Sequence, residues 1–218
     1  METIPSLYID TSNSLTIGLL DAQFKWIDYL SLEEKKSSRK IHALIYKMVK
    51  KNKVNLAQID SLIVTAGPGS YTGIRVAEGI AQICEWQKWN TYSFYHFEVP
   101  WMVKKENCKM AWLALAFKGE IFIYYQDQAG VFVRELFSKD DYSDRINALL
   151  AEGHELYANN PAELPGLPAY TLLDSSKLIF DFPAEIFGAV VAKQMRHPPY
   201  YFRSLAKEFS VAKTALMP

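Results

Sequence analysis

The chain has 218 residues, half of them apolar and 22% charged, which is enough to bury a substantial core and excludes wholesale disorder. The formal net charge is zero, whereas a protein that binds nucleic acid by itself normally carries a basic excess. No apolar run approaches the ~20 residues of a transmembrane helix. The N-terminus leads directly into a strand without a signal peptide, so we expect a cytoplasmic protein with Cys84 and Cys108 reduced.

The first part of the chain predicts three strands followed by a helix. Polar turns at 13–14 and 21–23 separate strands at 7–9, 15–20 and 24–30, the last of which has period-two alternation. Ser37 and Ser38 can cap a helix, because their hydroxyl groups accept hydrogen bonds from free backbone N–H groups. The apolar stripe of this helix has helical spacing and consists of Ile41, Leu44, Ile45, Met48 and Val49.

A glycine-rich loop joins a predicted strand at 61–66 to a helix expected to end near residue 86. It reads Gly67-Pro68-Gly69-Ser70-Tyr71-Thr72-Gly73. Glycines there let the backbone turn sharply and approach a ligand closely. It is not a Walker loop, because its last glycine is followed by Ile74 and Arg75. It is not a dinucleotide fingerprint either, because Thr72 stands where that motif needs glycine.

The second half repeats an alternation of strands and helices. Strands are expected at 91–95, 110–116, 121–126, 131–138 and 154–158, and helices at 97–104, 142–150 and 183–196, with a proline-rich connector at 161–168. The order of three strands, helix, strand and helix is typical of an RNase H-like half domain, the building block of the actin/Hsp70/sugar-kinase superfamily. We expect a first lobe at 1–104 and a smaller second lobe at 105–218, whose last helix is a candidate to pack back on the first.

The loop also carries a family resemblance. The string GPGSYTGIRVAEGIAQ resembles the signature of the TsaB (YeaZ) family, which usually reads GPGSFTGLRIG. Residues 7–12 (LYIDTS) are similar to L-x-I-D-T-[AS], 119–122 (GEIF) to G-E-V-Y, and 199–203 (PYYFR) to P-x-Y-x-R. The family's first helix carries a His and a Pro where this chain has Ser37 and Ala43, and its D-A-R is replaced by 115–117 (LAF). The resemblance implies an α/β fold of two RNase H-like lobes, the second degenerate.

Asp10, Thr11 and Ser12 are the candidates for a nucleotide contact. In kinases and ATPases of the superfamily an Asp on the first strand helps to place Mg²⁺ and phosphate. The plainer interpretation is that Asp10 ends its strand and bonds the backbone of the next turn. An ATPase would also need a second acidic strand and a second glycine-rich loop, and the second lobe reads Leu113-Ala114-Leu115-Ala116-Phe117 there. Catalysis is therefore not expected, while residual nucleotide contact stays open.

The sequence offers neither a metal site nor a hydrolase motif. The four histidines are scattered without metal-ligand spacing, and no cysteines are paired. Ser70 is followed by Tyr71 and Thr72, so there is no nucleophile elbow. A glycoprotease-like peptidase activity, which an older label for these proteins suggests, is not favoured.

Arg75 and the two first-lobe helices are the candidate interaction elements. Arg75 is expected to fix the loop by donating hydrogen bonds to the loop carbonyls, and a weak surface ion pair is the alternative. Tyr71 is expected to pack under the loop. Both helices are core helices by default, but the second is apolar nearly all round. Gly73, Ala77 and Ala81 form a small-residue ladder that suits helix docking.

The resemblance implies that these helices bind the subunit TsaD or, alone, a second copy of the chain. The expected contact residues are Ile41, Leu44, Ile45, Met48, Ile74, Ala77, Ile80, Ala81 and Cys84. The implied role is a non-catalytic subunit of the machinery that makes N6-threonylcarbamoyladenosine at position 37 of tRNAs reading ANN codons. In this role the chain binds TsaD and holds it in an ordered state, and the P-loop ATPase TsaE joins the complex. The chain contacts tRNA only through that complex.

On this interpretation no cofactor or metal is required, and ATP or ADP at the subunit junction stays open. The alternative is an active ATP-dependent small-molecule kinase or acyl-phosphate-forming enzyme of the same superfamily.

Overall fold

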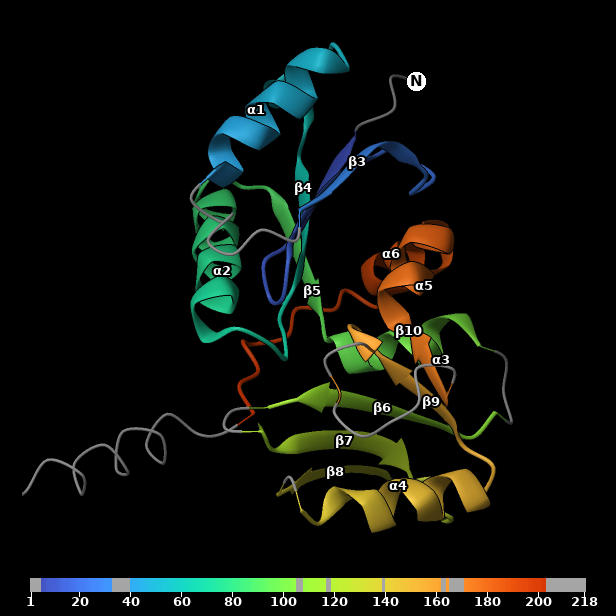
Figure 1. The fold of residues 1–218 in the computed structure, drawn as a ribbon. Helices are drawn as coiled ribbons and strands as arrows, with labels where there is room; N and C mark the ends of the chain where they lie inside the picture. The colour runs from blue at the N-terminus through green and yellow to red at the C-terminus, as the bar shows by residue number, and fades with distance from the viewer. Residues whose placement is uncertain are drawn as a thin grey trace, which may run out of the picture.

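Two five-stranded sheets form the framework of the protein (Figure 1). The computed structural model describes residues 5–32, 40–104, 108–116, 119–138, 140–161, 164 and 171–202. The first sheet has the order β3-β2-β1-β4-β5 and contains β1 (Ser6–Asp10), β2 (Leu15–Leu20), β3 (Trp26–Leu32), β4 (Ser61–Thr65) and β5 (Asn90–Phe94). The second has the order β10-β9-β6-β7-β8 and contains β6 (Met110–Leu115), β7 (Ile121–Gln126), β8 (Phe132–Phe137), β9 (Glu155–Ala158) and β10 (Leu172–Asp174).

Both sheets have the same topology. In each, three consecutive strands form an antiparallel meander, and two later strands add in parallel beside the first strand of that meander. This is the RNase H-like arrangement that the order of predicted elements indicated. The fold is therefore α/β with two RNase H-like lobes, as expected.

Burial along the strands follows their place in the sheet. Every residue of β1 and β2 is buried, because helices cover both faces of the first sheet. The edge strand β8 alternates between exposed and half-buried positions, so only one of its faces meets a core.

The helices from the two halves of the chain share the first sheet. α1 (Ile41–Lys51) and α2 (Tyr71–Trp86) pack on one face, in a core with Leu7, Ile9 and Val64. α5 (Ser175–Asp181) and α6 (Pro183–Ala192) lie on the opposite face, although they follow the second sheet in sequence (Figure 1). The domain boundary at residue 104 stays a prediction.

An aromatic core joins the lobes. α4 (Tyr142–Ala151) covers the outer face of the second sheet. Against the inner face lie the short helix η3 (His96–Glu98), α3 (Val99–Val103) and the segment after α6. Phe97, from the first half of the chain, contacts Trp112, Tyr124 and Tyr200, which all come from the second half. Because one continuous core spans the sheets, the lobes are held in a fixed relation.

Several element boundaries differ from the prediction. The third strand begins at Trp26 rather than at residue 24, because Phe24 has a φ of 58° and Asp21 Oδ1 accepts hydrogen bonds from the backbone N–H groups of Gln23 and Lys25. The last helix ends at Ala192 rather than near residue 196. Two residues after its end, Gln194 adopts a φ of 48°, which does not continue a right-handed helix.

Three elements were not predicted: β10, α5 and the short helix η2 (Leu56–Gln58). Ser37 and Ser38, the predicted caps, lie outside the described residues, and α1 begins after Lys40 without a side-chain cap. Among the described helices, none is long and apolar enough to cross a membrane.

Candidate functional site

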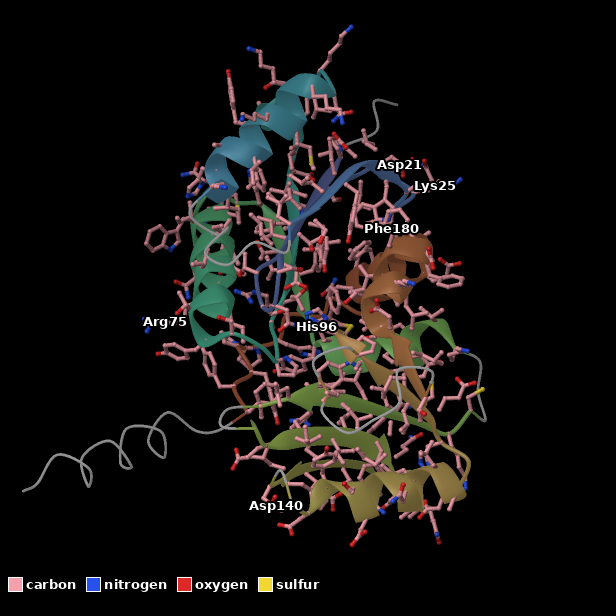
Figure 2. All side chains as sticks on the ribbon, viewed as in Figure 1. Asp21, Lys25, Arg75, His96, Asp140 and Phe180 are labelled. Carbon is pink, nitrogen blue, oxygen red and sulfur yellow. The ribbon has the colours of Figure 1, made fainter. Side chains whose placement is uncertain are left out.

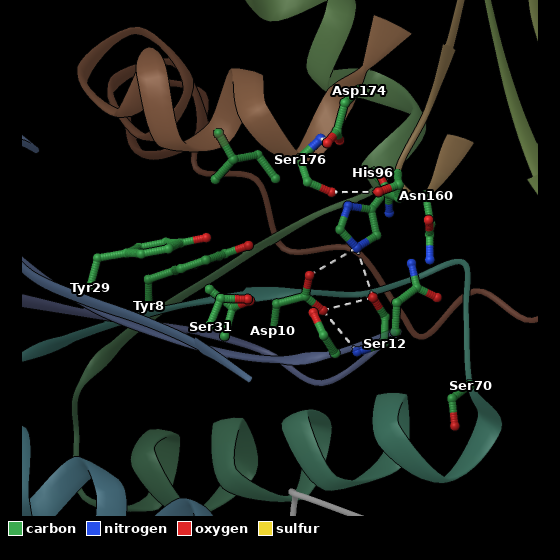
Figure 3. Close-up of a pocket in the computed structure, with 15 residues that line it drawn as sticks. Tyr8, Asp10, Ser12, Tyr29, Ser31, Ser70, His96, Asn160, Asp174 and Ser176 are labelled. Atoms are coloured by element: carbon green, nitrogen blue, oxygen red, sulfur yellow. Dashed lines mark hydrogen bonds and ion pairs between the residues drawn. The ribbon is translucent and has the colours of Figure 1, made fainter. Parts of the chain in front are cut away.

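A polar cleft of about 640 Å³ lies between the two lobes (Figure 3). The first lobe contributes residues from β1, β2 and β3, from the turn after β1, and from the segments that follow β4 and β5. The second lobe contributes residues after β9 and in and around the start of α5. The described lining residues are Tyr8, Asp10, Ser12, Asn13, Ser14, Thr16, Tyr29, Ser31, Ser70, His96, Asn159, Asn160, Asp174, Ser176 and Ile179.

The strand directions explain why these residues meet. β1, β4 and β5 are parallel, so Asp10, Ser70 and His96, which end or follow them, come to one edge of the first sheet. β9 and β10 are also parallel, and Asn159 and Asp174 stand at their carboxyl ends. Ligands in open α/β sheets bind outside the carboxyl ends of the strands.

Asp10, Ser12 and His96 form a buried hydrogen-bonded cluster at the floor of the cleft (Figure 3). Asp10 Oδ1 accepts hydrogen bonds from the Ser12 backbone N–H at 2.8 Å and from Ser12 Oγ at 2.7 Å. Asp10 Oδ2 lies 3.0 Å from His96 Nε2, which is also 2.7 Å from Ser12 Oγ.

Burial raises the pKa of the Asp10 carboxyl, but the nearby His96 and the hydrogen bonds from His96 and Ser12 lower it, and the net result is a pKa below the usual 3.8. Asp10 therefore stays ionised in the folded protein.

This arrangement uses both oxygens of Asp10 internally. The plainer interpretation of Asp10, that it ends its strand and bonds the next turn, is confirmed by the hydrogen bond from the Ser12 N–H. A carboxylate held in this way has little capacity left for a cation. Among the described residues, no group of three His, Cys, Asp or Glu is placed to hold a metal ion.

The cluster also lacks the geometry of a hydrolytic triad. In such a triad the carboxylate holds one imidazole nitrogen and the other takes the proton of the serine. Here Asp10 and Ser12 both contact Nε2, and Nδ1 has no partner among the described residues. Ser12 is fully buried. These three side chains therefore do not form an activated nucleophile.

The glycine loop packs tightly against the turn after β1. A Cβ on Gly69 would lie 2.5 Å from the Ser12 carbonyl oxygen, and one on Gly73 would lie 1.7 Å from that of Thr11. Thr11 Oγ1 donates to the Gly73 carbonyl at 2.6 Å, and Ser70 caps α2 by accepting from the Gly73 N–H at 3.3 Å. These glycines are required by contact with the protein's own backbone.

The remaining loop residues face the C-terminal segment, a small cavity or solvent. Gly67 has a φ of 103° and lies against the Tyr200 backbone, whose N–H donates to Ala66. Pro68 lines a small cavity of about 30 Å³ that shares Asn159 and Asn160 with the cleft. Thr72 is exposed at the start of α2.

Tyr71 and Arg75 contact each other, and Tyr71 also contacts the C-terminal segment. The Tyr71 ring lies 5.0 Å from that of Tyr201, and its packing under the loop stays a prediction. Arg75 Nη1 donates to Tyr71 Oη at 2.9 Å, and Figure 2 shows Arg75 on the outer side of α2. Among the described residues, Arg75 therefore holds the ring of Tyr71, which packs on Tyr201, and is not seen to bond the loop carbonyls.

The predicted partner-binding residues divide into two groups. Ile41, Met48, Ala77 and Ala81 are buried in the core against the first sheet, and Ile74 is buried beside Gly67. Leu44, Ile45, Ile80 and Cys84 are half-buried at the margin of that core. The expectation that Gly73, Ala77 and Ala81 form a ladder for a partner helix is wrong. These small residues let α2 approach its own sheet, and a charge at Ala77 or Ala81 would enter the core.

The exposed apolar residues of these helices were missed as candidates. Trp86 is 79% exposed, Ile83 54% and Tyr46 58%. An apolar composition all round a helix cannot indicate which side faces the sheet, so the sequence did not separate them from the core residues.

His96, Asn159 and Asp174 were also missed at the cleft. For His96 and Asn159 the available signal was their place directly after predicted strands, because the carboxyl ends of parallel strands meet at one sheet edge. Asp174 ends β10, which was not predicted, so no signal marked it.

Comparison with solved structures identifies the architecture. The chain is similar to an uncharacterized protein with similarity to peptidase YEAZ from Pseudomonas aeruginosa, with a TM-score of 0.61 and 16% identity over 93% of this chain and 100% of that one. It is also similar to YeaZ from Pseudomonas aeruginosa, with a TM-score of 0.56 and 14% identity over 90% and 100% of the two chains. The chain has the YeaZ fold.

The sequence adds a second, local match. The family model of TsaD, tRNA N6-adenosine threonylcarbamoyltransferase, matches residues 31–89, which contain α1, β4 and α2. A comparison with curated proteins gives no match. The resemblance to the TsaB (YeaZ) family that the sequence showed thus agrees with both comparisons. The solved structures share the fold over most of the chain, and the TsaD family model matches a segment of the first lobe.

Proposed function

We propose that this chain is a non-catalytic scaffold subunit of the machinery that makes N6-threonylcarbamoyladenosine at position 37 of ANN-decoding tRNAs. In this role it binds and orders a TsaD transferase, together with TsaE, in the cytoplasm, and it meets tRNA only through the complex. The observation that carries the proposal is the YeaZ fold over 93% of the chain, combined with a TsaD-family match at residues 31–89, which contain α1 and α2.

An exposed apolar surface on α2 supports a partner-binding role. Ile83 and Trp86 stand three residues apart, so they lie on one side of the helix. Gly79 has no atom within 4 Å of the position of a Cβ, which leaves room for close approach nearby. Tryptophans are enriched among the residues that dominate binding energy at interfaces. This surface would receive TsaD or, in isolation, a second copy of the chain.

The cleft supports a non-catalytic role. Asp10 is fully engaged by Ser12 and His96, and none of the described residues that line the cleft is Lys or Arg. Phosphoryl transfer depends on groups that neutralise the phosphate charge. In this proposal no cofactor is required, and any ATP or ADP would sit at the junction with the partner.

The direct test is co-purification with the cognate TsaD. Ile83→Glu and Trp86→Glu place a charge on the proposed surface, and we expect each to abolish capture of TsaD while leaving the fold intact. Val131→Glu is the matched control, because Val131 is 59% exposed on the second lobe. Normal capture by both α2 variants would show that TsaD does not bind this surface.

The rival function, an active small-molecule kinase, makes a different prediction. It requires ATP turnover by the purified chain that is lost in Asp10→Ala. The scaffold proposal expects no turnover by the chain alone.

A further inference from the structure

The cleft between the lobes holds two buried polar atoms that have no hydrogen-bond partner among the described residues. They are His96 Nδ1 and Asn159 Nδ2, and both side chains line the cleft. The His96 ring is only 2% exposed. Nearly all buried polar groups in native proteins are paired, so two unpaired groups in one cleft, one from each lobe, indicate a missing partner.

A hydrogen-bond chain fixes the orientation of the Asn159 amide. Trp112 Nε1 donates to Ser175 Oγ at 3.1 Å, and Ser175 Oγ donates to Asn159 Oδ1 at 2.6 Å. An indole N–H can only donate, so the Ser175 hydroxyl must pass its own proton to the carbonyl oxygen of the amide. Asn159 therefore keeps Oδ1 on the protein side and offers Nδ2 as a free donor.

The Asp10 carboxylate fixes the orientation of the His96 ring in the same way. A carboxylate only accepts hydrogen bonds, so the nitrogen that faces Asp10 Oδ2 at 3.0 Å carries a proton. In the neutral ring Nδ1 is then an acceptor, and in the charged ring it is a donor. A hydroxyl group can pair with it in either state.

The charge of the lining disfavours an anion. Two carboxylates, Asp10 and Asp174, face the cleft, and among its fifteen described lining residues there is no Lys or Arg. His96 is bonded to Asp10, so even a protonated ring would offset only the charge of that carboxylate and not that of Asp174. Most of the other described lining groups are uncharged hydroxyls and amides, from Ser12, Asn13, Ser14, Thr16, Ser31, Ser70, Asn159, Asn160 and Ser176.

We propose that this cleft binds a neutral compound with several hydroxyl groups, of the monosaccharide or nucleoside class. Its hydroxyls pair with His96 Nδ1 and Asn159 Nδ2, and the surrounding serine and asparagine side chains complete the contacts. A volume of about 640 Å³ is within the range of small-molecule sites. The proposal goes beyond the scaffold function and does not depend on it.

The test compares pairs of probes that differ only by a phosphate. Ribose, glucose and adenosine are titrated into the full chain, alongside ribose 5-phosphate, glucose 6-phosphate and AMP, with binding measured by saturation-transfer NMR and calorimetry. We expect at least one neutral probe to bind, and its phosphorylated counterpart to bind about tenfold more weakly or worse. Failure of all three neutral probes, or tighter binding of the phosphorylated ones, would overturn the proposal.

Two variants locate the site. Asn159→Ala removes the free donor, and we expect the affinity for the neutral probe to fall about tenfold. Asn147→Ala, at an exposed position of α4, is the matched control and should bind like the wild type. Equal binding by both variants would place the ligand elsewhere.

Asp174→Asn keeps the cap of α5, because asparagine accepts the same bond from the Ser176 N–H, and it removes one negative charge. We expect this variant to bind the phosphorylated probe severalfold more tightly than the wild type does. If the affinity of this variant for the phosphorylated probe, relative to that for the neutral probe, equals the wild-type value, the cleft does not select by charge.

Discussion

At the scale of single residues, glycines and an aspartate that look like parts of a phosphate site are used for internal contacts. Gly69 and Gly73 allow the loop to touch the backbone of Thr11 and Ser12, and Asp10 is bonded by Ser12 and His96. Residue types that suggest phosphate chemistry in the sequence therefore have a packing role in the folded chain.

The two glycines of α2 give a matched test of this packing role. Gly73→Ala should lower the free energy of unfolding by about 1–3 kcal/mol, since a Cβ there would meet the Thr11 carbonyl. Gly79→Ala, in open space, should raise it by up to about 1 kcal/mol, because alanine favours the helix. Urea denaturation of both variants measures the difference. Equal effects of the same sign would contradict the packing role.

Asp10 should make the stability of the protein depend on pH in the acid range. Its pKa is depressed in the folded state, so its stabilising contribution is present above the ordinary value of 3.8 and is lost as pH falls through the lower folded pKa. Asp10→Asn should be less stable than the wild type at neutral pH, and this gap should shrink below pH 3.8. Denaturation curves from neutral to acid pH test this, with exposed Asp60→Asn as control. A gap that widens toward acid pH would contradict the assignment.

At the scale of elements, α2 has two chemically distinct sides. Ala77 and Ala81 face the sheet, and Ile83 and Trp86 face outward. The sequence alone marked the whole helix as apolar, and only the packing separates its core side from its exposed side.

Charged substitutions on the two sides should therefore behave differently. Ala81→Glu should destabilise the fold by about 3–5 kcal/mol, because it buries an unpaired charge, whereas Ile83→Glu should change stability by less than about 0.5 kcal/mol. Thermal denaturation of the two variants decides the point. A folded, stable Ala81→Glu protein would mean that α2 is rotated from the position described.

Some helices and strands could be predicted from the sequence more accurately than others. Strands such as β2 and β7, and the helix after the glycine loop, follow from local periodicity, so the sequence placed them closely. β10 and α5 have no such local pattern and were not predicted. Their stability comes from contacts with β9 and with the other helices, which the sequence does not reveal. The cleft could not be assembled from sequence patterns, because Asp10, His96 and Asn159 are far apart in the chain and meet only through strand pairing.

At the scale of the whole molecule, the aromatic core around Phe97 binds the two lobes into one folding unit. Phe97 is fully buried and contacts rings from the second sheet and from the C-terminal segment. A continuous core predicts cooperative unfolding of the whole chain.

Phe97→Ala should lower the free energy of unfolding by about 3–5 kcal/mol, because it leaves a cavity between the sheets. Unfolding of the wild type followed by far-UV circular dichroism and by tryptophan fluorescence should give coincident transitions. Two separate transitions in the wild type would show that the lobes unfold independently.

The proposed function is most directly tested by reconstituting tRNA modification from purified TsaD and TsaE, the threonylcarbamoyl donor and a tRNA that reads ANN codons. We predict that N6-threonylcarbamoyladenosine forms when this chain is added, is not formed without it, and is lost with Trp86→Glu but kept with Val131→Glu. Equal modification with and without the chain would contradict the scaffold role.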